Sequence, residues 1–347
     1  MPSCTPYSYI VVGAQYGVPV ICRARQALGG TIVVPAGIAR LAVHPNGSFV
    51  YASNPGANTV SVLDMNLNVV AATVPVGSSP QVLGLTPGGS RLFVGNYNAS
   101  SYSVVDTASR AVLGTIPGPT HPFTIAFQPA GSYAFAIGDF EQTVTVINTN
   151  SLAVAATISL GAFLQDVTVS PNGSFVYASG CNSQTVSVID ASSWSVVATV
   201  TTPRCSVYLA HSPDGSYLYD SSGPGTLSGF WVIDTLTRSI VGSFLAGASP
   251  EHMAVHPSGS YVYIYKGNGT VSVYSRSGNW ISGQIMVGSP PSGINIGAVP
   301  SRITIAPDGS FVYVANASSV SVIATSSQTV VANILVDTGY GPILSGP

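Results

Sequence analysis

A Pro-x-Gly-Ser turn recurs along this chain at a nearly constant interval. It is written as HPNGSFVYA at 44–52, as SPDGSYLYD at 212–220 (preceded by His211) and as APDGSFVYV at 306–314. The prolines of the turns are Pro45, Pro87, Pro129, Pro171, Pro213, Pro257 and Pro307, at intervals of 42, 42, 42, 42, 44 and 50 residues. A period of this length is typical of propellers and solenoids, in which each repeat is one supersecondary unit.

Between the turns, four short apolar segments follow one another in a constant order. Between Pro45 and Pro87 these segments are FVYASN (49–54), TVSVLD (59–64), VVAATVPVG (69–77) and QVLGLT (81–86). Each alternates or runs apolar over a few residues between Gly, Pro, Asn or Asp, which is the signature of a strand, and no helical periodicity of about ten residues occurs. Four antiparallel strands per repeat indicate the blade of a β-propeller. We therefore predict an all-β chain that forms a single β-propeller domain over residues 1–347.

The two ends of the chain determine the predicted number of blades. Residues 6–36 contain three strand-like segments without an innermost one, and residues 339–347 follow the last outermost strand where another innermost strand is due. We predict eight blades, with 6–36 and 339–347 forming the closing blade, because this arrangement leaves no open sheet edge at the seam. The alternative is seven blades, with the N-terminal segment as an extra flap or strand.

Composition excludes two classes of partner. The net charge is −2, only 6% of the residues are charged, and Lys and Arg form no run. Nucleic acids and anionic lipids need a positive patch, so we exclude both. No apolar stretch reaches the roughly 18 residues of a membrane span, and the opening MPSCTPYSYIVVGAQYG has no early basic residue and does not read as a secretory signal.

Two repeats carry a resemblance to a known family. They are SPNGSFVYASGCNSQTVSVIDASSWSVVATV (170–200) and PDGSFVYVANASSVSVIATSSQTVVANILV (307–336). Both resemble the YVTN family of β-propeller repeats, known from archaeal surface-layer proteins and exported bacterial proteins. The resemblance implies the propeller fold and an extracellular or cell-surface location. Related propellers include lactonases, a streptogramin lyase and the eight-bladed domain that carries haem d1, but none of their site motifs can be transferred to residues of this chain.

Most acidic residues and histidines have a structural explanation. Asp64, Asp106, Asp190 and Asp234 each end a third strand, and Asp214 and Asp308 lie in the Pro-Asp-Gly turns, where an Asp side chain bonds its own turn. His44, His211 and His256 share one register or lie next to it. Equivalent positions on different blades are spread around a ring, so these histidines are not expected to converge on a metal, and we predict no metal site and no cofactor.

The polar residues that the repeat does not require fall at one end of the predicted propeller. At the starts of innermost strands lie Arg40, Gln81, His121, Gln165, Asp166, Arg204, Glu251, His252 and Arg302. On neighbouring loops we expect Asp139, Glu141, Asp220 and Lys266. Either these side chains form a ligand-binding pocket over the central channel, or they solvate the channel mouth and pair with one another. In an enzyme, Asp166, Glu251 and His252 would supply acid and base, with Arg204 or Arg302 holding a carboxylate or an oxyanion.

The cysteines and the sequons favour an exported protein. Cys4 and Cys22 fall at one end of the first blade, and Cys181 and Cys205 fall at the opposite end of a later one, so we predict the disulfides Cys4–Cys22 and Cys181–Cys205. Free buried thiols are the alternative for either pair. Candidate N-glycosylation sites are Asn46, Asn98, Asn172, Asn268 and Asn316.

Three classes of function remain. The first is a non-enzymatic extracellular or cell-surface protein, a structural subunit or adhesion module that binds copies of itself, other surface proteins or glycans. Its low charge favours self-assembly into oligomers or filaments, because few ions must lose water when copies pack together. The second is a propeller hydrolase or lyase that acts on a lactone or sugar-derived substrate at the channel mouth. The third is a redox propeller of the haem d1 kind.

Overall fold

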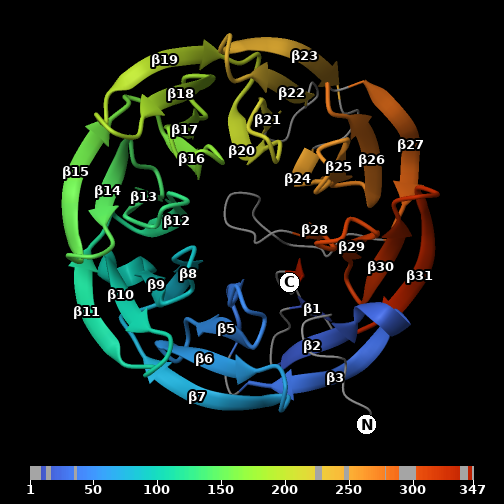
Figure 1. Cartoon of the computed structure of the whole chain (residues 1–347), viewed down its shortest axis with the longest axis horizontal. Coiled ribbons are helices and arrows are strands. Elements are labelled where there is room, and N and C mark those ends of the chain that lie inside the picture. The colour runs from blue at the N-terminus through green and yellow to red at the C-terminus, as the bar shows by residue number, and fades with distance from the viewer. Residues whose placement is uncertain are drawn as a thin grey trace.

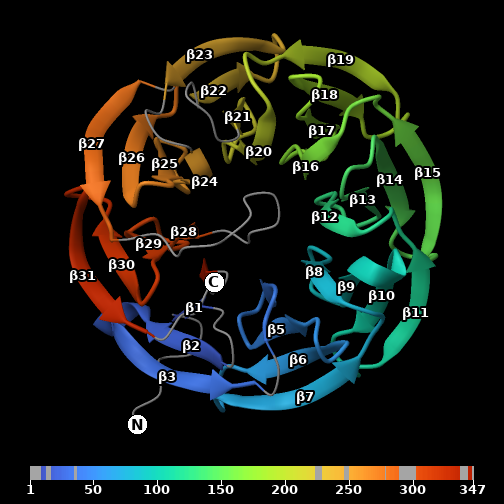
Figure 2. The same ribbon diagram turned by 180° about the vertical axis from the view of Figure 1, so that it is seen from behind.

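The computed structural model of the chain is a ring of eight β-sheets (Figures 1 and 2), and we call the region that their innermost strands enclose the central channel. It describes residues 9–12, 17–34, 37–222, 229–245, 250–277, 279–288, 302–336 and 343–345, without the side chains at positions 11, 245, 251 and 283. Each sheet has four antiparallel strands, and the described residues contain no α-helix. The prediction of an all-β propeller with eight blades is confirmed.

The strands take four positions between the channel and the outer rim. The innermost strands are β32 (Ile343–Ser345), β4 (Leu41–Val43), β8 (Pro80–Leu85), β12 (Pro122–Phe127), β16 (Leu164–Val169), β20 (Ser206–His211), β24 (Pro250–Val255) and β28 (Ile303–Ile305). The second strands are β1 (Tyr9–Val12), β5 (Phe49–Asn54), β9 (Arg91–Asn96), β13 (Tyr133–Gly138), β17 (Phe175–Gly180), β21 (Tyr217–Ser222), β25 (Tyr261–Lys266) and β29 (Phe311–Ala315).

The third strands are β2 (Gly17–Cys22), β6 (Thr59–Asp64), β10 (Ser101–Asp106), β14 (Thr143–Asn148), β18 (Thr185–Asp190), β22 (Gly229–Asp234), β26 (Thr270–Ser275) and β30 (Ser319–Ala324). The outermost strands are β3 (Ala27–Val33), β7 (Val69–Pro75), β11 (Val112–Pro117), β15 (Ala153–Ser159), β19 (Val196–Thr201), β23 (Ser239–Leu245), β27 (Trp280–Met286) and β31 (Thr329–Leu335). Two single-turn 3-10 helices, η1 (Arg23–Arg25) and η2 (Tyr97–Ala99), connect strands.

We number the blades in chain order. Blade 1 has the strand order β3-β2-β1-β32, so strands from both ends of the chain share one sheet, and Ile10 of β1 is opposite Ser345 of β32. Blades 2 to 8 are β4–β7, β8–β11, β12–β15, β16–β19, β20–β23, β24–β27 and β28–β31.

The hydrophobic core lies between the blades. The buried apolar residues form eight clusters, and each cluster combines side chains from two neighbouring sheets. Between blades 5 and 6, for example, Tyr177 and Val188 pack against Leu209 and Leu218. Successive residues of a strand point to opposite faces of its sheet, so each strand supplies two such interfaces. Polar residues within these layers are therefore exceptions to the pattern.

The repeated turn has a physical reason in the backbone. Its glycine takes a positive φ, as at Gly215 (72°) and Gly173 (74°), which a residue with a Cβ rarely adopts. At the far end of the second strand, the asparagines that end β5 and β9 are buried and bond their neighbours. Asn96, for example, donates from Nδ2 to the hydroxyl oxygens of Ser101 (3.2 Å) and Ser103 (3.0 Å). The repeated residues thus build the blade.

Candidate functional site

One register of the repeat lies at the start of the innermost strands, which enclose the central channel. It is the residue five positions before each turn proline, near the start of the innermost strand. In blades 3 to 7 this residue directly follows a register shift between the innermost and second strands, which re-aims the side chain. We call this set the channel ring. Its members are Arg40, Val82, Thr124, Asp166, Tyr208, His252 and Arg302.

Asp166 is the acidic member of the channel ring. Its Oδ1 accepts a hydrogen bond from its neighbour Val167 N (2.9 Å), and its Oδ2 accepts one from Leu209 N of blade 6 (2.9 Å). Asp166 is half-buried, and the burial of its carboxyl group raises the pKa to about 7, although both hydrogen bonds and the charge of Arg40 act in the opposite direction. Asp166 therefore changes its charge near neutral pH.

Three further polar members of the channel ring, Arg40, Tyr208 and His252, are connected to Asp166 directly or through one another. Arg40 interacts electrostatically with Asp166 and Tyr208, and burial lowers the pKa of its guanidinium. Burial and the charge of Asp166 raise the pKa of Tyr208 to about 12, so its hydroxyl stays protonated at neutral pH. The ring of His252, which is 5% exposed, lies edge-on to Tyr208 at 5.6 Å between centroids. The fold thus joins residues of blades 2, 5, 6 and 7.

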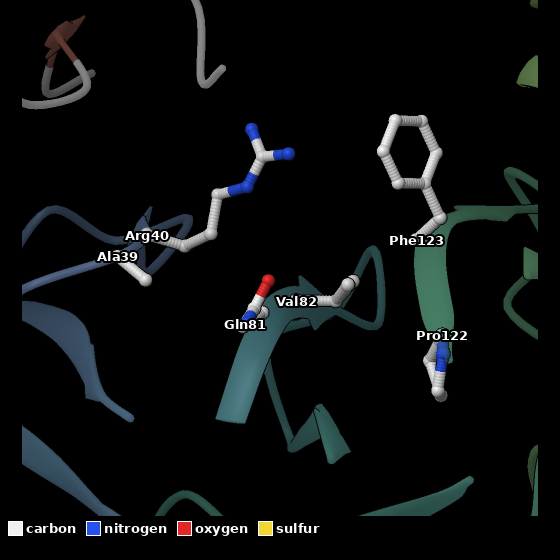
Figure 3. A pocket seen from close by; sticks show the side chains of 6 residues that line it. All are labelled: Ala39, Arg40, Gln81, Val82, Pro122 and Phe123. Atoms are coloured by element: carbon white, nitrogen blue, oxygen red, sulfur yellow. The ribbon is translucent and has the colours of Figure 1, made fainter. Parts of the chain in front are cut away.

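A small pocket opens beside Arg40 (Figure 3). Its lining residues are Ala39, Arg40, Gln81, Val82, Pro122 and Phe123, from blades 2, 3 and 4. Figure 3 shows the Arg40 side chain and the Phe123 ring extending from opposite sides, with the Gln81 amide between them. Gln81 donates from Nε2 to Ser79 Oγ (3.3 Å). A cation, an amide and an aromatic ring suit an oxygen-rich organic ligand.

The other predicted site residues have different positions. His121 stacks on Tyr97 at 4.4 Å, and the Tyr97 hydroxyl donates to Asp139 Oδ2 (3.0 Å). Arg204 lies exposed in the loop before β20. Arg302 belongs to the channel ring and is 5% exposed, whereas the side chain of Glu251 lies outside the described residues.

Two expectations about this end of the propeller are wrong. Asp220 and Lys266 are not on loops but at buried positions of β21 and β25. In addition, the sequence analysis missed Tyr208. Aligning the seven turns places Tyr208 in the register of Asp166 and His252, so this signal was present in the sequence.

The six aspartates that were predicted to bond their own turns do so. Asp64 Oδ1, for example, accepts from the backbone nitrogens of Asn66 (2.9 Å) and Leu67 (3.0 Å), and Asn148 takes the same role in blade 4. Hydrogen bonds from Ser192 and Ser193 lower the pKa of Asp190 to about 2. Within the described ranges, no group of three or more His, Cys, Asp or Glu is placed to hold a metal ion.

One disulfide links blade 5 to blade 6. The predicted disulfide Cys181–Cys205 is present and joins the loop after β17 to the residue before β20, where Ser206 and Tyr208 follow. Cys22, at the end of β2, is also disulfide-bonded, while its predicted partner Cys4 lies outside the described residues.

Replacing Cys181 and Cys205 together by Ser should lower the free energy of unfolding by about 3 kcal/mol, as expected for a loop of this size, with a sequence separation of 24. Guanidinium unfolding of the double variant under non-reducing conditions measures this loss, because the other disulfide stays intact. An unchanged midpoint would show that the bond does not constrain the unfolded chain.

The sequons divide into two groups. Asn46, Asn98, Asn172 and Asn268 are exposed. Asn316 is 3% exposed, and its Nδ2, to which a glycan would attach, donates to Val287 O (2.8 Å) and Ser321 Oγ (2.9 Å). The expectation for Asn316 is therefore wrong for the folded protein. No helix in the described part of the chain is long and apolar enough to span a membrane.

A family model decides the relationship of the chain. The model described as lactonase, 7-bladed β-propeller, matches residues 23–113 and 232–334, which together exceed half of the sequence. The chain belongs to this lactonase family. The family is described with seven blades, whereas this member has eight four-stranded sheets. No protein of curated function matches the sequence.

Solved structures share the fold. Dihydro-haem d1 dehydrogenase NirN, in complex with DHE, has a TM-score of 0.81 and 15% identity over 99% of this chain and 76% of that one. Hydrazine synthase from Kuenenia stuttgartiensis has a TM-score of 0.65 and 22% identity, over 83% and 95% of the two chains. A functionally unknown protein from Desulfotomaculum acetoxidans has a TM-score of 0.64 and 15% identity, over 80% and 95%. At these identities the likeness concerns the fold alone.

Proposed function

We propose that this chain hydrolyses a lactone or related sugar-derived substrate at the mouth of the channel, with Asp166 as the general base. The observation that carries the proposal is the Asp166 carboxyl on the channel ring, whose pKa of about 7 suits proton transfer at neutral pH. Membership of the lactonase family supports the substrate class. This is the second of the three functions that the sequence leaves open.

The proposed reaction adds one water to one lactone. The Asp166 carboxylate takes a proton from water as the water oxygen bonds to the lactone carbonyl carbon, and the Arg40 guanidinium stabilises the oxyanion. When the ring C–O bond breaks, the proton on Asp166 passes to the leaving alkoxide. The product is a hydroxy acid, which releases its own proton at neutral pH. Asp166 thereby returns to its starting state.

The charges of the channel ring favour a substrate that carries a carboxylate. The ring contains two arginines, Arg40 and Arg302, but one acidic residue, Asp166, which is about half neutral at pH 7. Arg40 also borders the pocket of Figure 3, where Gln81 and Phe123 offer an amide and an apolar face. We infer that a lactone with a free carboxylate, such as the monolactone of a sugar diacid, fits better than a neutral one.

The test is proton release on lactone opening, followed with a pH indicator. The substrates are glucono-δ-lactone and the matched pair γ-butyrolactone and its 3-carboxylate, paraconate. We expect turnover above the spontaneous rate, with a higher kcat/KM for paraconate than for γ-butyrolactone. Rates equal to those of buffer on all three compounds would contradict the proposal.

The hypothesis of a surface module has narrower support. The disulfide Cys181–Cys205 suits an oxidising, extracellular compartment, and four sequons lie on the surface. Neither the fold nor the family points to a structural subunit, to self-assembly or to glycan and surface-protein partners, so these remain hypotheses. An exported hydrolase is compatible with the same disulfide.

The hypothesis of a haem d1 propeller has only the blade number and the likeness of shape in its favour. The pocket of Figure 3 is lined by Ala, Arg, Gln, Val, Pro and Phe, none of which ligates the iron of a haem-type macrocycle. The described residues of this pocket do not fit such a macrocycle, and we propose no haem here.

A further inference from the structure

Asp220 occupies a position that the repeat reserves for apolar residues. Counted from the turn proline, its equivalents in the other blades are Ala52, Val94, Ala136, Ala178, Ile264 and Val314. Asp220 is 0% exposed and lies on the same face of β21 as Leu218, which packs into the layer between blades 5 and 6. A buried carboxyl in an apolar layer is costly, so the fold does not explain its presence.

The hydrogen bonds of Asp220 are incomplete. Ser206 Oγ, which is also 0% exposed, donates to Asp220 Oδ1 (2.6 Å). Asp220 Oδ2 has no hydrogen-bond partner among the described residues. Ser206 itself replaces an apolar residue, since the other repeats have Ile38, Pro80, Pro122, Leu164, Pro250 and Pro300 at this position. Two departures from the repeat thus meet in one hydrogen bond.

Asp220 lies close to Asp166 through a shared neighbour. Leu209 of β20 is directly opposite Asp220 in the sheet of blade 6. The backbone nitrogen of the same Leu209 donates to Asp166 Oδ2 across the interface with blade 5 (2.9 Å). The two carboxyl groups therefore flank one residue of β20, with Asp166 on the channel side.

The protonation of Asp220 depends on Asp166. Burial raises the pKa of Asp220 to about 8, the bond from Ser206 opposes this rise, and the negative charge of Asp166 adds to it. Around Asp166, Arg40 and Tyr208 are the charged and titratable groups that interact with it. Burial lowers the pKa of His211, at the end of β20, to about 4, so its imidazole stays neutral in this range.

We propose that Asp166 and Asp220 form a coupled carboxyl pair across the interface of blades 5 and 6, in which Asp220 is a positioning residue for Asp166. Asp166 exchanges its proton with the channel, and its charge then holds the proton on Asp220. As the pH rises, Asp166 releases its proton to solvent first, and Asp220 releases its proton afterwards. The catalytic role of the pair rests on the proposed hydrolysis. In that reaction Asp220 stays protonated and neutral while Asp166 takes up and gives back a proton.

The test is a carboxyl titration that needs no substrate. The chain is labelled with 13C at the side-chain carboxyl of aspartate, and the resonances are followed from pH 5 to 10; with ten aspartates in the whole chain, few signals overlap. We expect two aspartate signals of the parent to titrate above pH 6. In Asp220→Asn, the signal of Asp166 should remain. In Asp166→Asn, the signal of Asp220 should remain, but its midpoint should be roughly half a pH unit or more lower, because the negative charge of Asp166 is gone.

Two further variants keep the test decisive. Asp220→Ala reproduces the residue of three other blades, so it should fold if Asp220→Asn does not. Ser206→Ala removes the donor to Asp220 Oδ1 and should move the Asp220 midpoint to higher pH without removing either signal. Independent titrations, with each variant leaving the other midpoint in place, would overturn the proposal. Coupled titration in a chain without lactone hydrolysis would instead overturn the proposed function alone.

Discussion

Asp166→Asn is expected to lower kcat/KM for lactone hydrolysis by roughly 10²- to 10⁴-fold, the usual contribution of a positioned general base. The amide keeps the shape of the side chain and can still accept from Leu209 N, but it cannot take a proton from water. In the parent enzyme, kcat/KM should rise with pH through a value near 7, because burial raises the pKa of Asp166 to about 7 and only the ionised form acts as a base.

The measurement is the pH–rate profile of both proteins with the best lactone of the three tested. Asp64→Asn is the matched control, because Asn148 already occupies the equivalent position in blade 4 and makes the same turn bonds. This control should keep the rate and the pH profile of the parent. A variant at position 166 with parental kcat/KM would exclude Asp166 as the base.

Asp220→Asn is expected to stabilise the protein at alkaline pH, by roughly 3–5 kcal/mol at pH 9 relative to the change at pH 5. The folded-state pKa of Asp220 is raised from 3.8 to about 8, and each pKa unit corresponds to about 1.4 kcal/mol. A group with a raised folded-state pKa contributes stability below its unfolded pKa and loses this contribution as the pH rises toward the folded-state value. The asparagine does not titrate and avoids this loss.

Thermal melts from pH 4 to pH 10 measure the effect. The difference in Tm between Asp220→Asn and the parent should grow between pH 5 and pH 8 and level off above it, with a gain of roughly 5 °C for a chain of this length. Asp64→Asn, at the end of β6, is the control for a change from carboxyl to amide outside the blade interface. A difference in Tm that stays constant over this range would mean that Asp220 is not held protonated in the fold.

Much of the fold could be predicted because the sequence pattern of one blade recurs along the chain. Each of the seven repeats has a turn proline, a glycine such as Gly215 that accepts a positive φ, and alternating segments that form strands. These features act locally and recur in every repeat. The eight-blade count followed from matching the two ends of the chain to this repeat. The disulfide Cys181–Cys205 was predictable for the same reason, since the blade pattern places both cysteines at one end of adjacent sheets.

The candidate site was only partly predictable. The sequence pointed to Arg40, Asp166, His252 and Arg302 as polar residues near the channel, yet it set Asp220 on a loop and passed over Tyr208. A tyrosine resembles the aromatic residues that the blades bury elsewhere, so only its register, and not its type, marks it as part of the channel ring.

The sequence by itself determined the blade, because strand period, turn chemistry and apolar alternation act over a few neighbouring residues. Only the tertiary structure decided which polar residues meet and what charge they carry. Asp166 and Leu209, 43 positions apart, bond because the ring closes blade against blade. Burial in that ring raises the pKa of Asp166 to about 7 and that of Asp220 to about 8, and burial is a property of the packed interface rather than of either residue.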